Sequence, residues 1–468
     1  MNALWLVSLL VLVAVAAWRM RTHGPRSAIG IAVAIAIVLP VWVSQNLGGQ
    51  PIDLRIAGTA CALLMYLAHR EGTIRTKLVA IDFMVFGLVA VHCLADWYHD
   101  GFSLGVFLRA YGEWLLPYFA GRLAIQSMDD VRDLIPVLVV VGCALGGLSL
   151  IEAVANVNPF EAIFGNRPVK ATSRSLQRWG LKRSFGPTQH PIYLAVLQLI
   201  LMPWLLYAFS LAKRQHGPAW WLGAPFLCAM GIIVTGSRAA TLAIPILLYI
   251  AAILVFKQWR KPLLLGGGAI VVLGGLFFQP ILNGMQEWSG ELKNTKPTIL
   301  VDGEVVRYTG TTNRLHLLKV YRPAMQRAGL LGFGTEAVSG FPINVPVGPQ
   351  DIETLKRVRY IDNAYVLMLL RFGWLGLLGF IAVGVSVLVS QIRLASMTHR
   401  SGTQLFACLA GGTAAFLLTL MTVWMPHDFG FFYLWIAGAT AGRLANLRPM
   451  ARVVHRPSGR GVHRTRAA

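Results

Sequence analysis

The sequence predicts an all-α fold, a polytopic transmembrane helix bundle of about 12–13 spans with a large helical loop on one face. Hydrophobic residues make up 56% of the 468 residues and charged residues only 13%, a balance typical of membrane proteins. Apolar stretches of about 17–25 residues recur from end to end, which is the length that an α-helix needs to cross a membrane. The expected spans are 3–18, 28–45, 52–69, 78–95, 104–121, 134–152, 191–211, 219–235, 237–256, 262–280, 362–390, 402–424 and 429–447.

These spans divide the chain into six parts. They are N-terminal transmembrane helices (1–152), a basic loop (153–190), further transmembrane helices (191–280), a large loop (281–361), C-terminal transmembrane helices (362–447) and a basic tail (448–468). All five cysteines fall within spans, so we expect free buried thiols rather than disulfides.

The distribution of Lys and Arg predicts how the chain is oriented. Alternate connections and the C-terminal tail hold 22 of the 42 Lys and Arg residues. They are 19–26, 70–77, 122–132, 213–214, 257–261, 393–400 and 443–466. Because basic connections stay in the cytoplasm, loops 153–190 and 281–361 should face outward. The tail, which lacks aromatic residues, is better suited to anionic lipid than to nucleic acid.

The outward loops carry unusual positive charge. The segment from Pro280 to Ile361 holds ten Lys and Arg residues, which indicates an anionic ligand on this face. In the first loop, basic residues four apart predict an amphipathic helix at the interface: Lys170, Arg174, Arg178 and Lys182. Two interpretations stay open, a helix lying on anionic headgroups and a cationic rim that collects phosphorylated lipid.

The next motif runs from Arg183 to Pro191 and opens a new span. Pro191 suits a first helical turn, and Gly186-Pro187 predicts a bend ahead of it. Arg183 and His190 are therefore expected at the outer mouth of the membrane. A histidine in this position is either a helix-end hydrogen-bonding residue or a catalytic base.

Arg238 follows Thr235-Gly236-Ser237 between two apolar runs that leave almost no room for a loop. An arginine between long spans is costly unless it faces a polar cavity or a partner. It either extends to the outer headgroups or grips a phosphate with its two-pronged guanidinium.

The large loop contains a predicted helix that starts near Thr312 or Asn313. Arg314 falls in its first turn, where a cation is unfavourable unless an anion binds there too. His316 and Arg322 lie further along the same helix. The glycine-rich turn 331–336 follows, and its backbone amides can approach a ligand.

Asp362 begins the eleventh span, and two interpretations fit it. It is either the N-cap of that helix or a carboxylate that takes a proton from an attacking hydroxyl. Within the spans, Arg109 and Glu113 are four residues apart and are expected to neutralise each other.

Several catalytic signatures are missing from the sequence. It has no P-loop lysine motif, no Asp-x-Asp pair typical of nucleotide-sugar transferases and no His/Cys cluster suited to zinc. We therefore expect no metal and no cofactor, and any reaction must use an already activated substrate.

The motifs between about Arg178 and Gly379 resemble the O-antigen ligase and O-antigen polymerase family of bacterial polysaccharide assembly. The likeness rests on their order: 183–191, Ser237-Arg238, Arg314 ahead of Gly332-Phe333-Gly334, Asp362-Asn363-Ala364-Tyr365, and 372–379. The resemblance implies a metal-independent glycosyltransferase in the bacterial inner membrane, with a periplasmic active face and a cytoplasmic C-terminus. Its substrate is a glycan on an undecaprenyl-diphosphate carrier.

By this resemblance, Arg183, Arg238 and Arg314 hold the donor diphosphate, with Arg178 and Arg322 as further candidates. Guanidinium groups in a water-poor site stabilise the charge that grows as the sugar leaves. The candidates for the base are Asp362, His190 and His316. Expected partners are the lipid-linked glycan, anionic lipid and other polysaccharide-assembly proteins, and not nucleic acid.

The chain departs from the family at Asp362, where ligases usually carry a histidine ahead of the asparagine. This favours a polymerase of exopolysaccharide or O-antigen repeat units. A ligase that transfers polysaccharide to lipid A core is the second hypothesis, and a lipid-linked oligosaccharide flippase is the third. Transporters tend to show internal repeats and ionisable residues at mid-membrane, whereas the cations here gather at the outer face.

Overall fold

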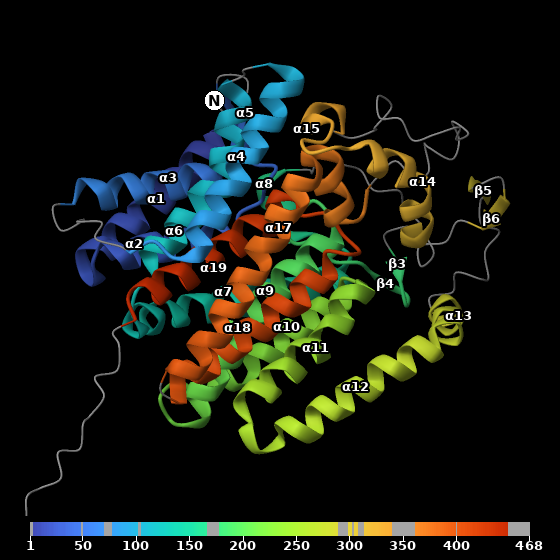
Figure 1. Ribbon diagram of the computed structural model, residues 1–468. Coiled ribbons are helices and arrows are strands. Elements are labelled where there is room, and N and C mark those ends of the chain that lie inside the picture. Colours follow the sequence, from blue (N-terminus) through green and yellow to red (C-terminus); the bar gives the residue numbers. More distant parts are fainter. Residues whose placement is uncertain are drawn as a thin grey trace, which may run out of the picture.

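The chain folds into a bundle of helices, with smaller elements gathered along one side (Figure 1). The computed structural model describes residues 3–47, 50–69, 77–101, 104–165, 177–288, 298–301, 304–307, 313–338, 361–398 and 400–447. The all-α membrane bundle predicted from composition is confirmed, because the strands form only three short two-stranded hairpins among these residues.

The N-terminal third contains most of the short helices. The helices are α1 (Ala3–His23), α2 (Pro25–Ala36), α3 (Leu54–Ala68), α4 (Ala80–Asp100), α5 (Leu104–Ala110), α6 (Leu116–Ala124), α7 (Met128–Ala155) and α8 (Pro159–Phe164). A π-helical turn, Tyr111–Leu115, joins α5 to α6. Strands β1 (Ser44–Leu47) and β2 (Gln50–Asp53) pair antiparallel, with Ser44 opposite Asp53.

The remainder contains further helices of widely different length. They are α9 (Pro191–Lys213), α10 (Ala224–Val234), α11 (Arg238–Val255), α12 (Arg260–Leu276), α13 (Phe278–Trp288), α14 (Asn313–Arg327), α15 (Gly334–Ala337), α17 (Ala364–Met397), α18 (Arg400–Thr419) and α19 (His427–Ala445). Short 3-10 turns, Ala219–Gly223 and Lys257–Trp259, precede α10 and α12. The strands are β3 (Gln177–Arg178) with β4 (Leu181–Lys182), and β5 (Thr298–Val301) with β6 (Glu304–Arg307).

Fewer helices meet the requirements of a full span than the sequence predicts. Among the described residues, seven are long and apolar enough to cross a membrane: α1, α4, α7, α9, α11, α17 and α18. Helices α12 and α13 make an eighth only if their 77° bend lies within one span. Most of the other predicted spans contain shorter α-helices, because the chain leaves the helix at the β1–β2 hairpin after α2 and changes from α- to π-helical hydrogen bonding at Tyr111–Leu115 after α5.

The amphipathic helix predicted through Arg178 and Lys182 is wrong for the part that the structure describes. Residues 177–182 form the β3–β4 hairpin, in which Arg178 pairs with Leu181. Its turn is made by Trp179 and Gly180, with φ of 54° and 77°. The rest of the predicted helix, including Lys170 and Arg174, lies outside the described residues.

Basic connections from separate parts of the chain meet at one end of the bundle, called here the basic end. Arg26 forms an ion pair with Asp130 at 3.8 Å. Arg122 pairs with Asp82 at 2.9 Å and also donates to the carbonyl of Lys77. These contacts join the starts of α2, α4 and α7 to the end of α6, as the Lys and Arg distribution predicts.

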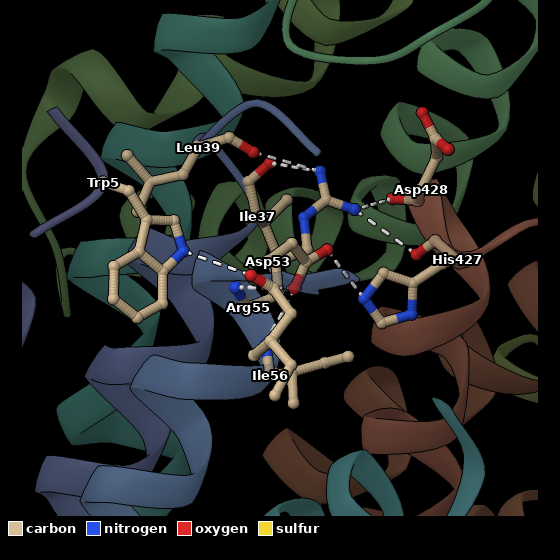
Figure 2. Close-up of polar contacts among 9 residues, drawn as sticks. Trp5, Ile37, Leu39, Asp53, Arg55, Ile56, His427 and Asp428 are labelled. Atoms are coloured by element: carbon tan, nitrogen blue, oxygen red, sulfur yellow. Dashed lines mark hydrogen bonds and ion pairs between the residues drawn. The ribbon is translucent and has the colours of Figure 1, made fainter. Parts of the chain in front are cut away.

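A buried polar network ties α3 to α19 at the opposite end, called here the loop end (Figure 2). Asp53 caps α3 by accepting hydrogen bonds from the amides of Arg55 and Ile56, and its carboxylate pairs with His427 Nε2 at 3.0 Å. Arg55 is only 2% exposed. It donates to four backbone carbonyls, those of Ile37, Leu39, His427 and Asp428. A buried guanidinium with this many acceptors holds the helices in register.

Helix α17 is broken at Gly373, whose φ of 65° lies in the left-handed region. Two amides after the break donate to another segment, Trp374 to the carbonyl of Gly329 and Leu375 to that of Leu330. The glycine-rich turn 331–336 therefore packs against α17. The approach is so close that a Cβ on Gly332 would lie 2.5 Å from the Arg371 carbonyl.

We expect Gly332→Ala to lower the free energy of unfolding by about 1–3 kcal/mol, because the added methyl would overlap backbone that cannot move aside. The φ of 71° at Gly332 adds strain. Gly147→Ala is the matched control, since its Cβ would meet nothing within 4 Å. Thermal unfolding of the detergent-purified variants measures both effects. Equal midpoints for the two variants would contradict the close approach.

Candidate functional site

Three predicted site arginines come together where α11 begins. Arg178 donates from its guanidinium to the carbonyl of Gly236, and Arg183 donates from Nε to the carbonyl of Thr235 at 2.8 Å. Arg238 is the first residue of α11, directly after this turn. A Cβ at Gly236 would lie 3.0 Å from Arg178 and 3.4 Å from Arg183, so the glycine leaves room for both side chains.

The arginine cluster (Arg178, Arg183 and Arg238) concentrates positive charge away from bulk water. Arg183 is buried, with 8% of its surface exposed. Burial, together with the charges of Arg178 and Arg238, lowers the pKa of Arg183 to about 9. An anion placed among the three groups would offset this repulsion, as expected for a site that holds a phosphate or diphosphate.

The segment ahead of α9 is held rigidly against α7. Glu152, buried within α7, accepts hydrogen bonds from the amides of Phe185 and Gly186, both at 2.9 Å. Gly186 has a φ of 53°, in agreement with the predicted bend. Helix α9 then starts at Pro191 as predicted, so the position of Arg183 is fixed by its neighbours on both sides.

A second charged group lies where α14 meets the start of α17. Arg314 donates from Nε to the carbonyl of Thr422 at 3.0 Å. Its charge also acts on Asp362: burial raises the pKa of this carboxyl group, and Arg314 partly offsets the rise. The structure thus brings Arg314 and Asp362 together, on elements distinct from those of the arginine cluster.

Asn363, not Asp362, caps α17. The Asn363 side-chain oxygen accepts hydrogen bonds from the amides of Tyr365 and Val366, at 3.0 and 3.1 Å. Its side-chain nitrogen donates to the carbonyl of Met421. The N-cap interpretation of Asp362 is therefore wrong, and its carboxylate is left for another role.

The turn between α18 and α19 (420–426) connects these groups. It accepts the hydrogen bonds of Arg314 and Asn363. It also carries Trp424, whose indole nitrogen donates to the hydroxyl of Tyr193 at 2.6 Å. The Tyr193 ring packs against that of His190, with centroids 5.3 Å apart.

The remaining predicted residues occupy different settings. His190 caps α9, where its Nδ1 accepts a hydrogen bond from the amide of Ile192 at 3.2 Å. His316 is two positions after Arg314 on α14, so the two side chains point to different faces of that helix. Arg322 is exposed on the same helix.

Sequence reasoning missed several residues that build this region. Glu152, Tyr193 and Trp424 gave no signal, because their roles depend on contacts between distant parts of the chain. Gly236 and Asn363, by contrast, did give a signal in the sequence. Glycine permits the positive φ of 64° at position 236, and asparagine is as good an N-cap as aspartate.

The site residues can now be compared with those of known families. Residues 223–381 match the O-antigen ligase family. The match covers part of the chain and agrees with the resemblance to this family that the motif order predicted. The matched segment contains Arg238, Arg314 and Asp362, whereas Arg178 and Arg183 lie ahead of it. No curated protein matches the chain.

We expect Asn363→Ala to lower the free energy of unfolding by about 1 kcal/mol, because two amides of α17 lose their acceptor. Asp362→Asn should leave stability close to that of the wild type, since Asp362 does not cap the helix. Thermal unfolding in detergent distinguishes the two. A larger loss from Asp362→Asn than from Asn363→Ala would contradict this assignment of the cap.

Proposed function

We propose that this protein is a bacterial inner-membrane glycan polymerase that joins undecaprenyl-diphosphate-linked repeat units at the periplasmic face, in exopolysaccharide or O-antigen synthesis. The observation that carries the proposal is the convergence of Arg178, Arg183 and Arg238 around Gly236. Arg178 and Arg183 lie ahead of α9, and Arg238 is the first residue of α11, so α9 and α10 separate them in sequence. Such a group suits a diphosphate, which needs several fixed cations at once.

The proposed orientation places the loop end in the periplasm and the basic C-terminal tail in the cytoplasm. The contacts among the basic connections at the opposite end support it. A diphosphate at the headgroup level would then lie in the arginine cluster, with its lipid chain in the membrane.

The proposed reaction is a substitution at the anomeric carbon of the donor glycan. A hydroxyl oxygen of the acceptor forms the new glycosidic bond while the bond to the lipid diphosphate breaks. The arginine cluster stabilises the departing diphosphate, and Arg314 contributes a further positive charge near the reacting groups.

Asp362 is the proposed base that takes the proton of the acceptor hydroxyl. Its pKa is raised by burial, which makes the carboxylate a better proton acceptor than an exposed one. Since Asn363 provides the cap, the Asp362 carboxylate has no structural task at the helix start. His190 is a weaker candidate because its Nδ1 already caps α9.

A ligase that transfers the glycan to lipid A core is the alternative that the family match leaves open. A flippase without catalysis is the third. Loss of the gene distinguishes the three. Single repeat units on the lipid carrier indicate a polymerase, long chains on the carrier a ligase, and lipid-linked material held in the cytoplasmic leaflet a flippase.

We expect Arg238→Ala to lower the rate of glycan transfer about 10²–10³-fold, because the departing diphosphate loses a fixed cation. Arg327→Ala is the control, an exposed arginine on α14. The measurement is polymer formation from lipid-linked repeat units by the purified variants in lipid nanodiscs. Wild-type rates for Arg238→Ala would remove the proposed diphosphate site.

The rate should also depend on the ionisation of Asp362. The base must be unprotonated, so the rate should fall as the pH drops through a value above about 4, the usual pKa of aspartate. Asp362→Asn should abolish this acid limb and lower the rate about 10²–10⁴-fold. An unchanged pH profile in this variant would exclude Asp362 as the base.

A further inference from the structure

A separate cavity of about 430 Å³ opens at the loop end. This volume is typical of small-molecule pockets, about 300–1,000 Å³. Its walls come from the β1–β2 hairpin, α4, the α5–α6 region, the first half of α17 and the start of α19. Within the described part of the chain, Arg178, Arg183, Arg238 and Asp362 are absent from its lining. Gln189 and Trp424 line it and also adjoin the candidate site.

Charges of both signs line this cavity. Arg109 and Arg371 face it together with Glu113, Asp53 and Asp428. The ion pair expected between Arg109 and Glu113 does not form in the described structure, so both groups can contact a ligand. The arginine cluster is wholly cationic, whereas this mixed lining offers donors and acceptors without favouring an anion.

Aromatic rings supply much of the remaining wall. They are Trp42, Trp114, Phe372, Trp424 and Phe431. A sugar ring presents hydroxyl groups around its edge and C–H bonds on its faces. A hollow that combines charged hydrogen-bonding groups with flat apolar rings is therefore suited to a neutral sugar.

Two of the walls have irregular helical backbone. Glu113 and Trp114 lie in the π-helical turn, and Arg371 lies two residues before the break in α17. π-helical turns are frequent at functional sites, and broken helices in membrane proteins commonly line binding sites. Glu113 and Arg371 thus line the same cavity although they lie on different helical segments.

We propose that this cavity binds a sugar ring of the acceptor glycan, with Glu113 and Arg371 hydrogen-bonded to its hydroxyl groups. The proposal rests on the glycan-transfer function and adds the location of the second substrate. The donor diphosphate is assigned to the arginine cluster, whereas among the described residues Gln189 and Trp424 are the cavity-lining residues that adjoin that region.

The test is direct binding to the full-length protein in nanodiscs. One probe is the repeat-unit oligosaccharide released from its lipid by mild acid, which lacks a diphosphate and can serve only as an acceptor. The other probe is inorganic pyrophosphate, which reports on the arginine cluster. Titration calorimetry gives the Kd of each.

We expect Glu113→Gln to raise the Kd of the oligosaccharide about tenfold and to leave the Kd of pyrophosphate unchanged, because a charged hydrogen bond is lost at the sugar alone. Glu336→Gln is the matched control, the same change at an exposed residue of α15. Arg238→Ala should raise the Kd of pyrophosphate and leave the Kd of the oligosaccharide unchanged. If Glu113→Gln does not fold, Gln189→Ala provides a second test, since the backbone bond from residue 189 to Asp428 is kept.

Wild-type oligosaccharide binding in both cavity variants would overturn the proposal, as would a wild-type protein that does not bind the oligosaccharide. If Glu113→Gln raised the Kd of pyrophosphate and not that of the oligosaccharide, the donor would bind in the cavity. This result would also overturn the acceptor assignment. If the sugar binds as expected but no polymer forms from lipid-linked repeat units, the transfer function fails while the cavity remains a sugar site.

Discussion

The turn between α18 and α19 holds the loop end of the molecule together. Backbone carbonyls of this turn and of the first residues of α19 accept hydrogen bonds from distant segments. Asn363 binds the carbonyl of Met421, Arg314 binds that of Thr422, and Arg55 binds those of His427 and Asp428. The Asp428 side chain also accepts the amide of Gln189. The turn and the start of α19 together fix α3, α14, α17 and the segment before α9.

Two different electrostatic environments occur at the loop end. On one side, burial together with the nearby charges of Arg178 and Arg238 lowers the pKa of Arg183. On the other side, the cavity holds arginines and carboxylates together. Such a division suits two substrates that differ in charge at their binding ends, one ending in a diphosphate and one in a neutral sugar.

Composition and hydropathy were sufficient to predict the membrane bundle, and the motif order was sufficient to predict the family that residues 223–381 match. Local signals also placed the start of α9 at Pro191, and the predicted span 237–256 begins one residue before α11 does at Arg238. The helix predicted over residues 177–182 was wrong. Basic residues four apart are also compatible with a hairpin when a glycine, here Gly180, permits the turn.

The described residues hold fewer full-length α-helices than predicted spans for a related reason. Hydropathy measures how apolar a stretch is and not which backbone hydrogen bonds it forms, so neither the hairpin after α2 nor the change to a π-helical turn after α5 was visible. The cavity escaped sequence reasoning entirely. Its charged residues are spread from Asp53 to Asp428, and only the packing of α3, α4, α17 and α19 brings them together.

Helix α17 sets the spatial relation between the proposed base and the proposed sugar site. Asp362 lies just ahead of its first residue and Arg371 lies just before its break. At 1.5 Å per residue, Ala364 and Arg371 are about 10 Å apart along the axis. Leu367 and Met368 line the cavity between them, so the hollow follows this half-helix toward Asp362. An acceptor with one sugar bound at Arg371 must extend along α17 to bring its reacting hydroxyl group to Asp362. This requires a glycan longer than one sugar. The repeat-unit oligosaccharide proposed as the acceptor meets that requirement.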